Sequence, residues 1–142
     1  MDKSILAPAA ALILWSILML VWLVATRLPA ISKAMGGIAK AAPGGRGQDL
    51  ERVLPPNINW KSHNYAHLME QPTIFYATVL ILAASGQSGG LNTTLAWAYV
   101  GLRIAHSLWQ ALVNTIPVRF SLFLLSTLVL LVLAINALRA TL

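Results

Sequence analysis

Two stretches of the chain place ionisable side chains inside otherwise apolar sequence. The first holds His63, His67 and Glu70, and the second holds Arg103 and His106. A charge inside a bilayer costs roughly 2.5–3.5 kcal/mol on insertion scales, so it is retained only when it is paired, hydrated or functional. These two stretches therefore carry most of the functional information in the sequence.

Helical geometry organises these polar residues into two faces. At about 100° per residue, His63, His67 and Glu70 fall within one narrow stripe, with Asn64 and Gln71 in a row beside it. The second stretch has one polar face of five residues: Arg103, His106, Ser107, Gln110 and Asn114. A rise of 1.5 Å per residue puts Glu70 and Arg103 roughly 12 and 16 Å from the same side of the membrane. We therefore predict a Glu70–Arg103 ion pair that faces the bundle interior.

Pro72 lies two residues after Glu70 and has no backbone N–H. It therefore leaves the Leu68 carbonyl without its helical partner and is expected to kink the helix. At membrane depth, a neighbouring helix, a hydroxyl group or water must satisfy that carbonyl.

Three interpretations of the polar residues stay open. They could hold the helices together, line a ligand site, or bind a metal or haem. His63, His67 and Glu70 have the i, i+4, i+7 spacing of zinc or iron ligands. The chain has only three histidines and no cysteine, however, and we expect no metal.

The composition is that of a membrane protein. The chain is 58% hydrophobic and 10% charged, with a mean hydropathy of +0.72. A membrane-spanning helix needs about 20 mainly apolar residues, and four segments reach that length: 5–26, 63–84, 91–113 and 119–138. We predict an all-α integral membrane protein, with residues 1–142 forming a single domain that is a four-helix transmembrane bundle.

The basic residues predict the orientation. The first loop, 28–60, and its flanks carry six Lys or Arg residues against two acidic ones, whereas the loop at 85–90 is uncharged. By the positive-inside rule, the first and third loops are cytoplasmic and both termini lie on the opposite side. The net charge of +6 mainly reflects this topology. A nucleic-acid partner is not expected, because the loop has no aromatic residue before Trp60. Its prolines and glycines predict little regular helix.

Two segments of the chain resemble the MAPEG family, the membrane-associated proteins of eicosanoid and glutathione metabolism. Residues 64–76 are similar to the second-helix signature of its bacterial members, and residues 97–107 are similar to their third helix. Arg103 to His106 and Pro117 to Arg119 also resemble microsomal prostaglandin E synthase. The resemblance covers nearly the whole chain.

The resemblance implies a homotrimer in a membrane, here the bacterial inner membrane, with a glutathione site between subunits near the cytoplasmic face. Glu70 and Arg103 match the buried acid and base of the family, and Arg119 matches an arginine of helix four. The candidate ligand-binding residues are Asn64, His67, Glu70, Arg103, His106, Gln110, Asn114 and Arg119. The catalytic candidates among them are Arg103, His106 and Arg119.

The sequence also departs from the family pattern. His63 and His67 stand where the enzymes have Arg and Asn, and Gln110 stands where the glutathione enzymes have Tyr. Thr115 replaces an arginine that stabilises the thiolate. Two functions therefore stay open: a glutathione transferase or peroxidase acting on lipophilic substrates, and a non-catalytic scaffold or accessory subunit of a larger membrane complex.

Overall fold

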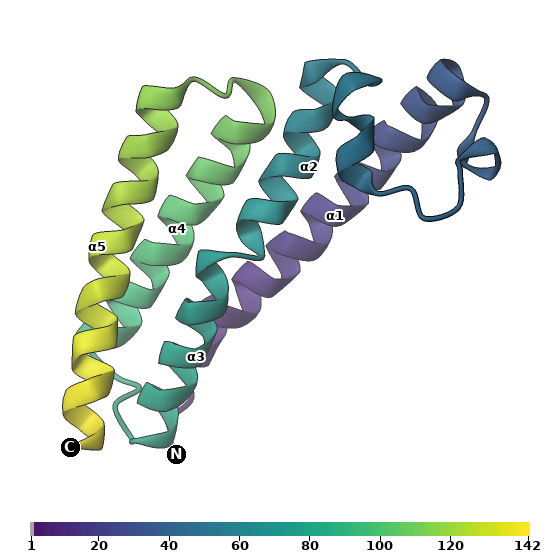
Figure 1. The fold of residues 1–142 in the computed structure, drawn as a ribbon. Helices are drawn as coiled ribbons and strands as arrows, with labels where there is room; N and C mark the ends of the chain where they lie inside the picture. The colour runs from purple at the N-terminus through teal and green to yellow at the C-terminus, as the bar shows by residue number, and fades with distance from the viewer. Residues whose placement is uncertain (1) are drawn as a thin grey trace.

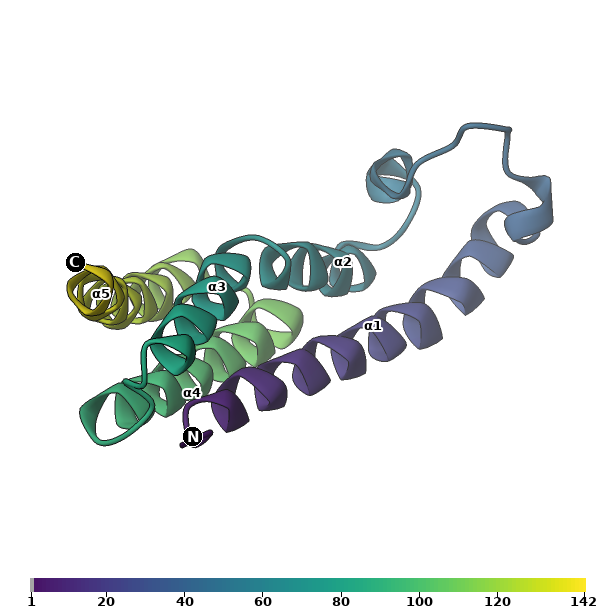
Figure 2. The same ribbon diagram turned by 90° about the horizontal axis from the view of Figure 1, so that it is seen from below.

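The computed structural model describes residues 2–142, and every regular element in that range is helical (Figure 1). Five α-helices follow one another along the chain: α1 (Leu6–Met35), α2 (Pro56–Leu68), α3 (Gln71–Ala84), α4 (Leu91–Leu112) and α5 (Ile116–Thr141). Helix α4 packs against α1, α2 and α5, and α3 packs against α5 and α1. Figure 2 shows α1 along one side of the molecule and α5 on the opposite side.

The segment predicted as one helix over 63–84 forms two helices instead. It begins earlier, at Pro56, where proline suits the first turn of a helix, and it breaks after Leu68. The chain resumes as α3 from Gln71, with Pro72 in its first turn. The kink predicted from Pro72 is thus a full interruption, with Glu70 as the N-cap of α3 at φ −88° and ψ −99°.

The first loop is shorter than the predicted 28–60. Helix α1 continues to Met35, and it ends on Gly36, whose φ of +78° closes the helix with an N–H bond to the Ser32 carbonyl. The connection to α2 contains only two short 3₁₀ turns, η1 (Ile38–Lys40) and η2 (Gly47–Arg52). The prediction of little regular helix in its middle is confirmed.

Helices α4 and α5 form a hairpin with a tight turn. Predicted bounds of 91–113 and 119–138 become Leu91–Leu112 and Ile116–Thr141, because Pro117 is accommodated in the first turn of α5 and does not precede that helix. Asn114 adopts φ +59° in the turn, and its N–H bonds to the Trp109 carbonyl at 2.7 Å.

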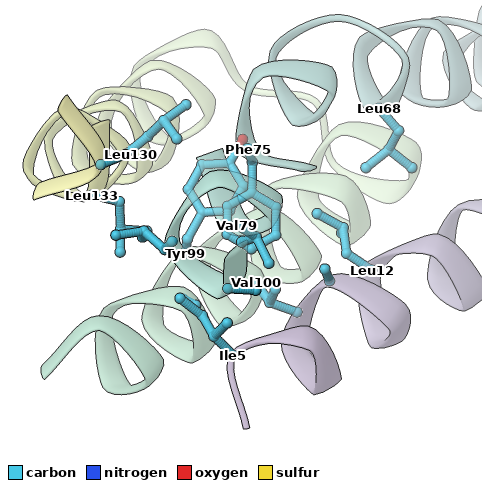
Figure 3. Packing of buried hydrophobic residues seen from close by; sticks show 14 of the residues in the cluster. Ile5, Leu12, Leu68, Phe75, Val79, Tyr99, Val100, Leu130 and Leu133 are labelled. Atoms are coloured by element: carbon cyan, nitrogen blue, oxygen red, sulfur yellow. The ribbon is translucent and has the colours of Figure 1, made fainter. Parts of the chain in front are cut away.

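The apolar core lies where α1, α3, α4 and α5 meet (Figure 3). Phe75 of α3 stacks on Tyr99 of α4 with ring centroids 4.4 Å apart, and both side chains are fully buried. Ile5, which caps the start of α1, Leu12 of α1 and Leu133 of α5 complete this centre. The core therefore fastens the chain's first helix to its last through α3 and α4.

The outer surface is apolar over much of α1 and α5. Both helices are long and apolar enough to cross a membrane, and only a small part of each apolar window is buried. Exposed leucine, isoleucine and valine side chains along them suit contact with lipid. Membrane crossing by α4 and by the interrupted α2–α3 segment stays a prediction.

The two ends of the bundle carry different parts of the chain. Ser4 Oγ donates to the Ser88 carbonyl at 2.6 Å, and Asn136 Nδ2 donates to Asn92 Oδ1 at 2.8 Å. Both termini and the 85–90 turn therefore share one end. The basic connection and the α4–α5 turn lie at the other end (Figure 1).

Candidate functional site

Arg103 of α4 is fully buried, at 0% exposure, and contacts the end of α2. Its Nη2 lies 2.8 Å from His67 Nδ1 and donates to the His67 carbonyl at 3.2 Å. Because a guanidinium only donates, His67 Nδ1 is the acceptor, which places the proton of the neutral ring on Nε2. Pro72 was expected to free the Leu68 carbonyl for a donor from a neighbouring helix. In the structure, Arg103 of α4 donates instead to the carbonyl of His67, one residue earlier.

The predicted Glu70–Arg103 ion pair does not form within the protomer. The salt bridge found in residues 2–142 joins His63 to Glu51 at 2.5 Å, and Glu70 lies exposed on the protomer surface. The helix break at Met69 and Glu70 is the reason, because it interrupts the 3.6-residue period that placed Glu70 beside His67. Arg103 faces the interior as predicted, and Glu70 does not.

His67 and His106 stack with ring centroids 4.6 Å apart and an interplanar angle of 14°. Phe123 of α5 meets the His67 ring edge-on at 5.6 Å. Beside these rings is a pocket of about 180 Å³, which is also lined by Ile116, Arg119 and Phe120. The α4–α5 hairpin and the end of α2 build this histidine pocket together.

The α4–α5 turn holds Arg119 at the pocket. Arg119 Nη1 donates to Asn114 Oδ1 at 2.6 Å, and Asn114 is the residue that makes the left-handed turn. Next to it, Trp109 Nε1 donates to Thr115 Oγ1 at 2.9 Å, so the threonine hydroxyl is already an acceptor. The turn therefore fixes one cation at the pocket wall.

The structure brings together only some of the predicted site residues. His67, His106 and Arg119 line the histidine pocket, and Asn114 holds Arg119. Arg103 lies behind His67, while Asn64 and Gln110 are buried with amide oxygens that lack a partner among residues 2–142. Glu70 is outside this group. Of the catalytic candidates, His106 and Arg119 reach the pocket and Arg103 does not.

Two features of the site region were not predicted. Gln71 links α3 to α5 and to α4. Its Nε2 donates to Thr127 Oγ1 of α5 at 2.8 Å, and its Oε1 accepts from the Tyr99 hydroxyl of α4 at 3.1 Å. Phe123 lies one turn beyond Arg119, and that i, i+4 spacing is the signal that could have placed it at the pocket. Tyr99 and Thr127 sit in apolar runs and give no such signal.

The metal alternative finds no geometric support. Across residues 2–142, no three His, Asp or Glu side chains come close enough to share an ion. His63 is turned towards Glu51 at 2.5 Å, so it does not join His67.

The family model described as "MAPEG family" matches residues 5–139, from the start of α1 to the last turn of α5. The chain belongs to the MAPEG family. The resemblance seen in residues 64–76 and 97–107 is therefore confirmed, and the protein is an integral membrane protein of that family. Neither the curated proteins nor the solved structures include a significant match to the chain.

Within this MAPEG chain, the segments that carried the resemblance meet at one place. Residues 64–76 contain the end of α2 and the helix break, and residues 97–107 contain Arg103 and His106 of α4. The contact of Arg103 with His67 joins them.

Proposed function

We propose that this MAPEG protein binds glutathione, or a similar small carboxylate-bearing anion, at the histidine pocket. The observation that carries the proposal is Arg119, a cation held by Asn114 at the wall of a pocket that His67 and His106 also line. A ligand carboxylate there would gain charge-assisted hydrogen bonds, which are roughly twice as strong as neutral ones.

The size of the pocket supports an oligomeric site. At about 180 Å³ it is smaller than the roughly 300–1,000 Å³ of typical ligand sites. We propose that a neighbouring protomer of a homotrimer supplies the rest of the site. Four membrane crossings, with the basic connection on the cytoplasmic side of a bacterial inner membrane, would put this pocket within reach of cytosolic glutathione.

The proposed activity is that of a transferase or peroxidase acting on lipophilic electrophiles that reach the pocket through the bilayer. In a transfer reaction, the thiol of glutathione would lose its proton to water, and the thiolate sulfur would attack the electrophilic carbon of an aryl halide, form the C–S bond and release the halide ion. A cation near the sulfur favours the thiolate, since a free thiol has a pKa near 8.5. Arg119 is the cation that lines the pocket.

A specific observation also favours the second candidate, a non-catalytic scaffold or accessory subunit. Gln110 is buried and is not part of the pocket wall, and the Thr115 hydroxyl is bonded by Trp109. Neither residue is placed to replace the tyrosine and arginine that the resemblance implies for the enzymes. The scaffold would bind the anion without activating its thiol.

Calorimetry on the detergent-solubilised oligomer tests binding. We expect saturable glutathione binding that Arg119→Ala weakens about tenfold or more, because a charged hydrogen bond contributes about 1.5–3 kcal/mol. Arg139→Ala is the matched control, since it removes the same charge from the other end of α5. Absence of binding at millimolar glutathione, with the oligomer intact, would reject the proposal.

Ultraviolet absorbance of the bound thiolate then separates the two functions. A transferase or peroxidase should show the thiolate band and should form a conjugate from glutathione and a lipophilic aryl halide. A scaffold should bind glutathione with neither signal.

A further inference from the structure

A second cavity lies between the second half of α1 and the connection to α2. Its volume is about 520 Å³, and it shares no lining residue with the histidine pocket. Apolar side chains make up most of its wall, among them Leu23, Ile31, Ile38, Leu50 and Val53. We call this cavity the α1 groove. Its size is within the roughly 300–1,000 Å³ range of small-molecule sites.

Polar contacts hold the connection against α1 and so form the groove. Arg27 Nη2 donates to the Gly47 carbonyl at 2.6 Å, and Nη1 donates to Ser62 Oγ at 3.1 Å. A Cβ at position 47 would lie only 3.3 Å from Arg27 Nη1, so glycine permits this close approach. One arginine thus fastens α1, the connection and α2 together beside the groove.

The residues next to the groove are of types that favour a membrane surface. Trp22 of α1 and Lys61 of α2 meet beside the groove, with the Lys61 ammonium 5.2 Å from the centre of the Trp22 ring, and both residue types favour the interface. Leu23 and Val24, which follow Trp22, line the groove. Figures 1 and 2 show the connection beside the tip of α1 and away from α5.

The charged residues that line the groove are Arg27, Arg46 and Asp49, so its wall carries two positive charges and one negative charge. Asp49 Oδ2 accepts the backbone N–H of Arg46 at 2.8 Å, and Glu51 pairs with His63 at 2.5 Å. No salt bridge within residues 2–142 involves the cations of this connection. Arg46 lines the groove itself. Basic residues beside a membrane attract anionic lipids, at about 1 kcal/mol for each.

We propose that the α1 groove binds one anionic phospholipid, with an acyl chain along the apolar wall and the phosphate near Arg46. A soluble anion would leave the apolar wall unused, and a neutral lipid would leave the positive charge unused. An anionic phospholipid would contact the apolar wall with an acyl chain and Arg46 with its phosphate, and such lipids are part of a bacterial membrane. The site is independent of the histidine pocket.

Native mass spectrometry of the delipidated oligomer in detergent tests the proposal with phosphatidylglycerol and phosphatidylcholine of identical acyl chains. We expect saturable binding of phosphatidylglycerol and much weaker binding of phosphatidylcholine. Arg46→Ala should weaken phosphatidylglycerol binding about fivefold, while Arg52→Ala, with the same charge change outside the groove wall, should have at most about a twofold effect.

A second pair of variants tests the apolar wall. Ile38→Glu places a charge in the groove at a side chain that is 63% exposed, so the fold should persist, and phosphatidylglycerol binding should be lost. Ala39→Glu adds the same charge one residue away, outside the wall, and should retain most of the binding. Equal losses within either pair, equal binding of the two lipids, or full competition by glycerol 3-phosphate alone would overturn the proposal.

Discussion

At the residue scale, the unusual feature is a buried arginine that is paired with a histidine rather than with a carboxylate. Arg103 Nη2 bonds to the ring and the carbonyl of His67, while Nε and Nη1 have no partner among residues 2–142. A buried charge is costly unless hydrogen bonds compensate it, so the two His67 contacts are the main compensation within the protomer.

We therefore expect His67→Ala to destabilise the protein by about 1–3 kcal/mol, because it removes an acceptor from a buried charged donor. A lower midpoint of thermal unfolding in detergent would show this. His63→Ala is the control, since it removes a histidine whose partner lies on the partly exposed surface and should cost less than about 1 kcal/mol. Equal effects of the two substitutions would mean that His67 does not stabilise Arg103.

At the element scale, Asn114 both shapes the α4–α5 turn and holds the Arg119 side chain. Asn114 adopts a left-handed conformation, which glycine adopts freely, and its side chain accepts a bond from Arg119. Backbone conformation and side-chain contact can therefore be separated by substitution.

Asn114→Gly should retain the turn and lose the Arg119 contact, so stability should change little while glutathione binding weakens. Asn114→Ala should lose both, with about 1 kcal/mol or more of additional destabilisation because alanine is strained at positive φ. Thermal unfolding and calorimetry on both variants measure the two effects. If the variants are equally stable, the turn does not depend on the left-handed conformation.

The elements also show how far the sequence predicts this fold. The length of the apolar runs predicted the bounds of α1, α4 and α5 to within a few residues, except at the C-terminal end of α1, which extends beyond its predicted end. Periodicity correctly placed Arg103 in the interior. The same periodicity failed at Glu70, because it assumes an unbroken helix and Pro72 marks only where a helix is weakened. The histidine pocket was predicted in part: His67, His106 and Arg119 were named, but Phe123 was not.

At the scale of the whole molecule, the two ends of the bundle should lie on opposite sides of the membrane. The chain contains no cysteine, so single introduced cysteines report accessibility without interference. In sealed inverted vesicles we expect a membrane-impermeant maleimide to label Gly45→Cys in the basic connection and not Gln87→Cys in the turn before α4.

This labelling also tests whether the α2–α3 segment crosses the membrane. If only α1 and α5 crossed the bilayer, positions 45 and 87 would lie on the same side and would label together. Opposite labelling requires the α2–α3 segment to cross despite its interruption, as the four-helix prediction states.

The contacts of α1 have a consequence for the order in which the protein is made. Trp15 Nε1 donates to Ser107 Oγ at 3.0 Å, and Ser4 reaches Ser88 and Thr93, all partners more than 80 residues later in the chain. A ribosome delivers α1 to the membrane long before α4 exists, whereas α4 and α5 are neighbours in synthesis. Helix α1 must therefore remain in the lipid without its α4 partners until the later helices have been synthesised. Chains that stop before α4 leave Trp15 without Ser107 and Ser4 without Thr93, so the polar groups of α1 in such chains lack these partners.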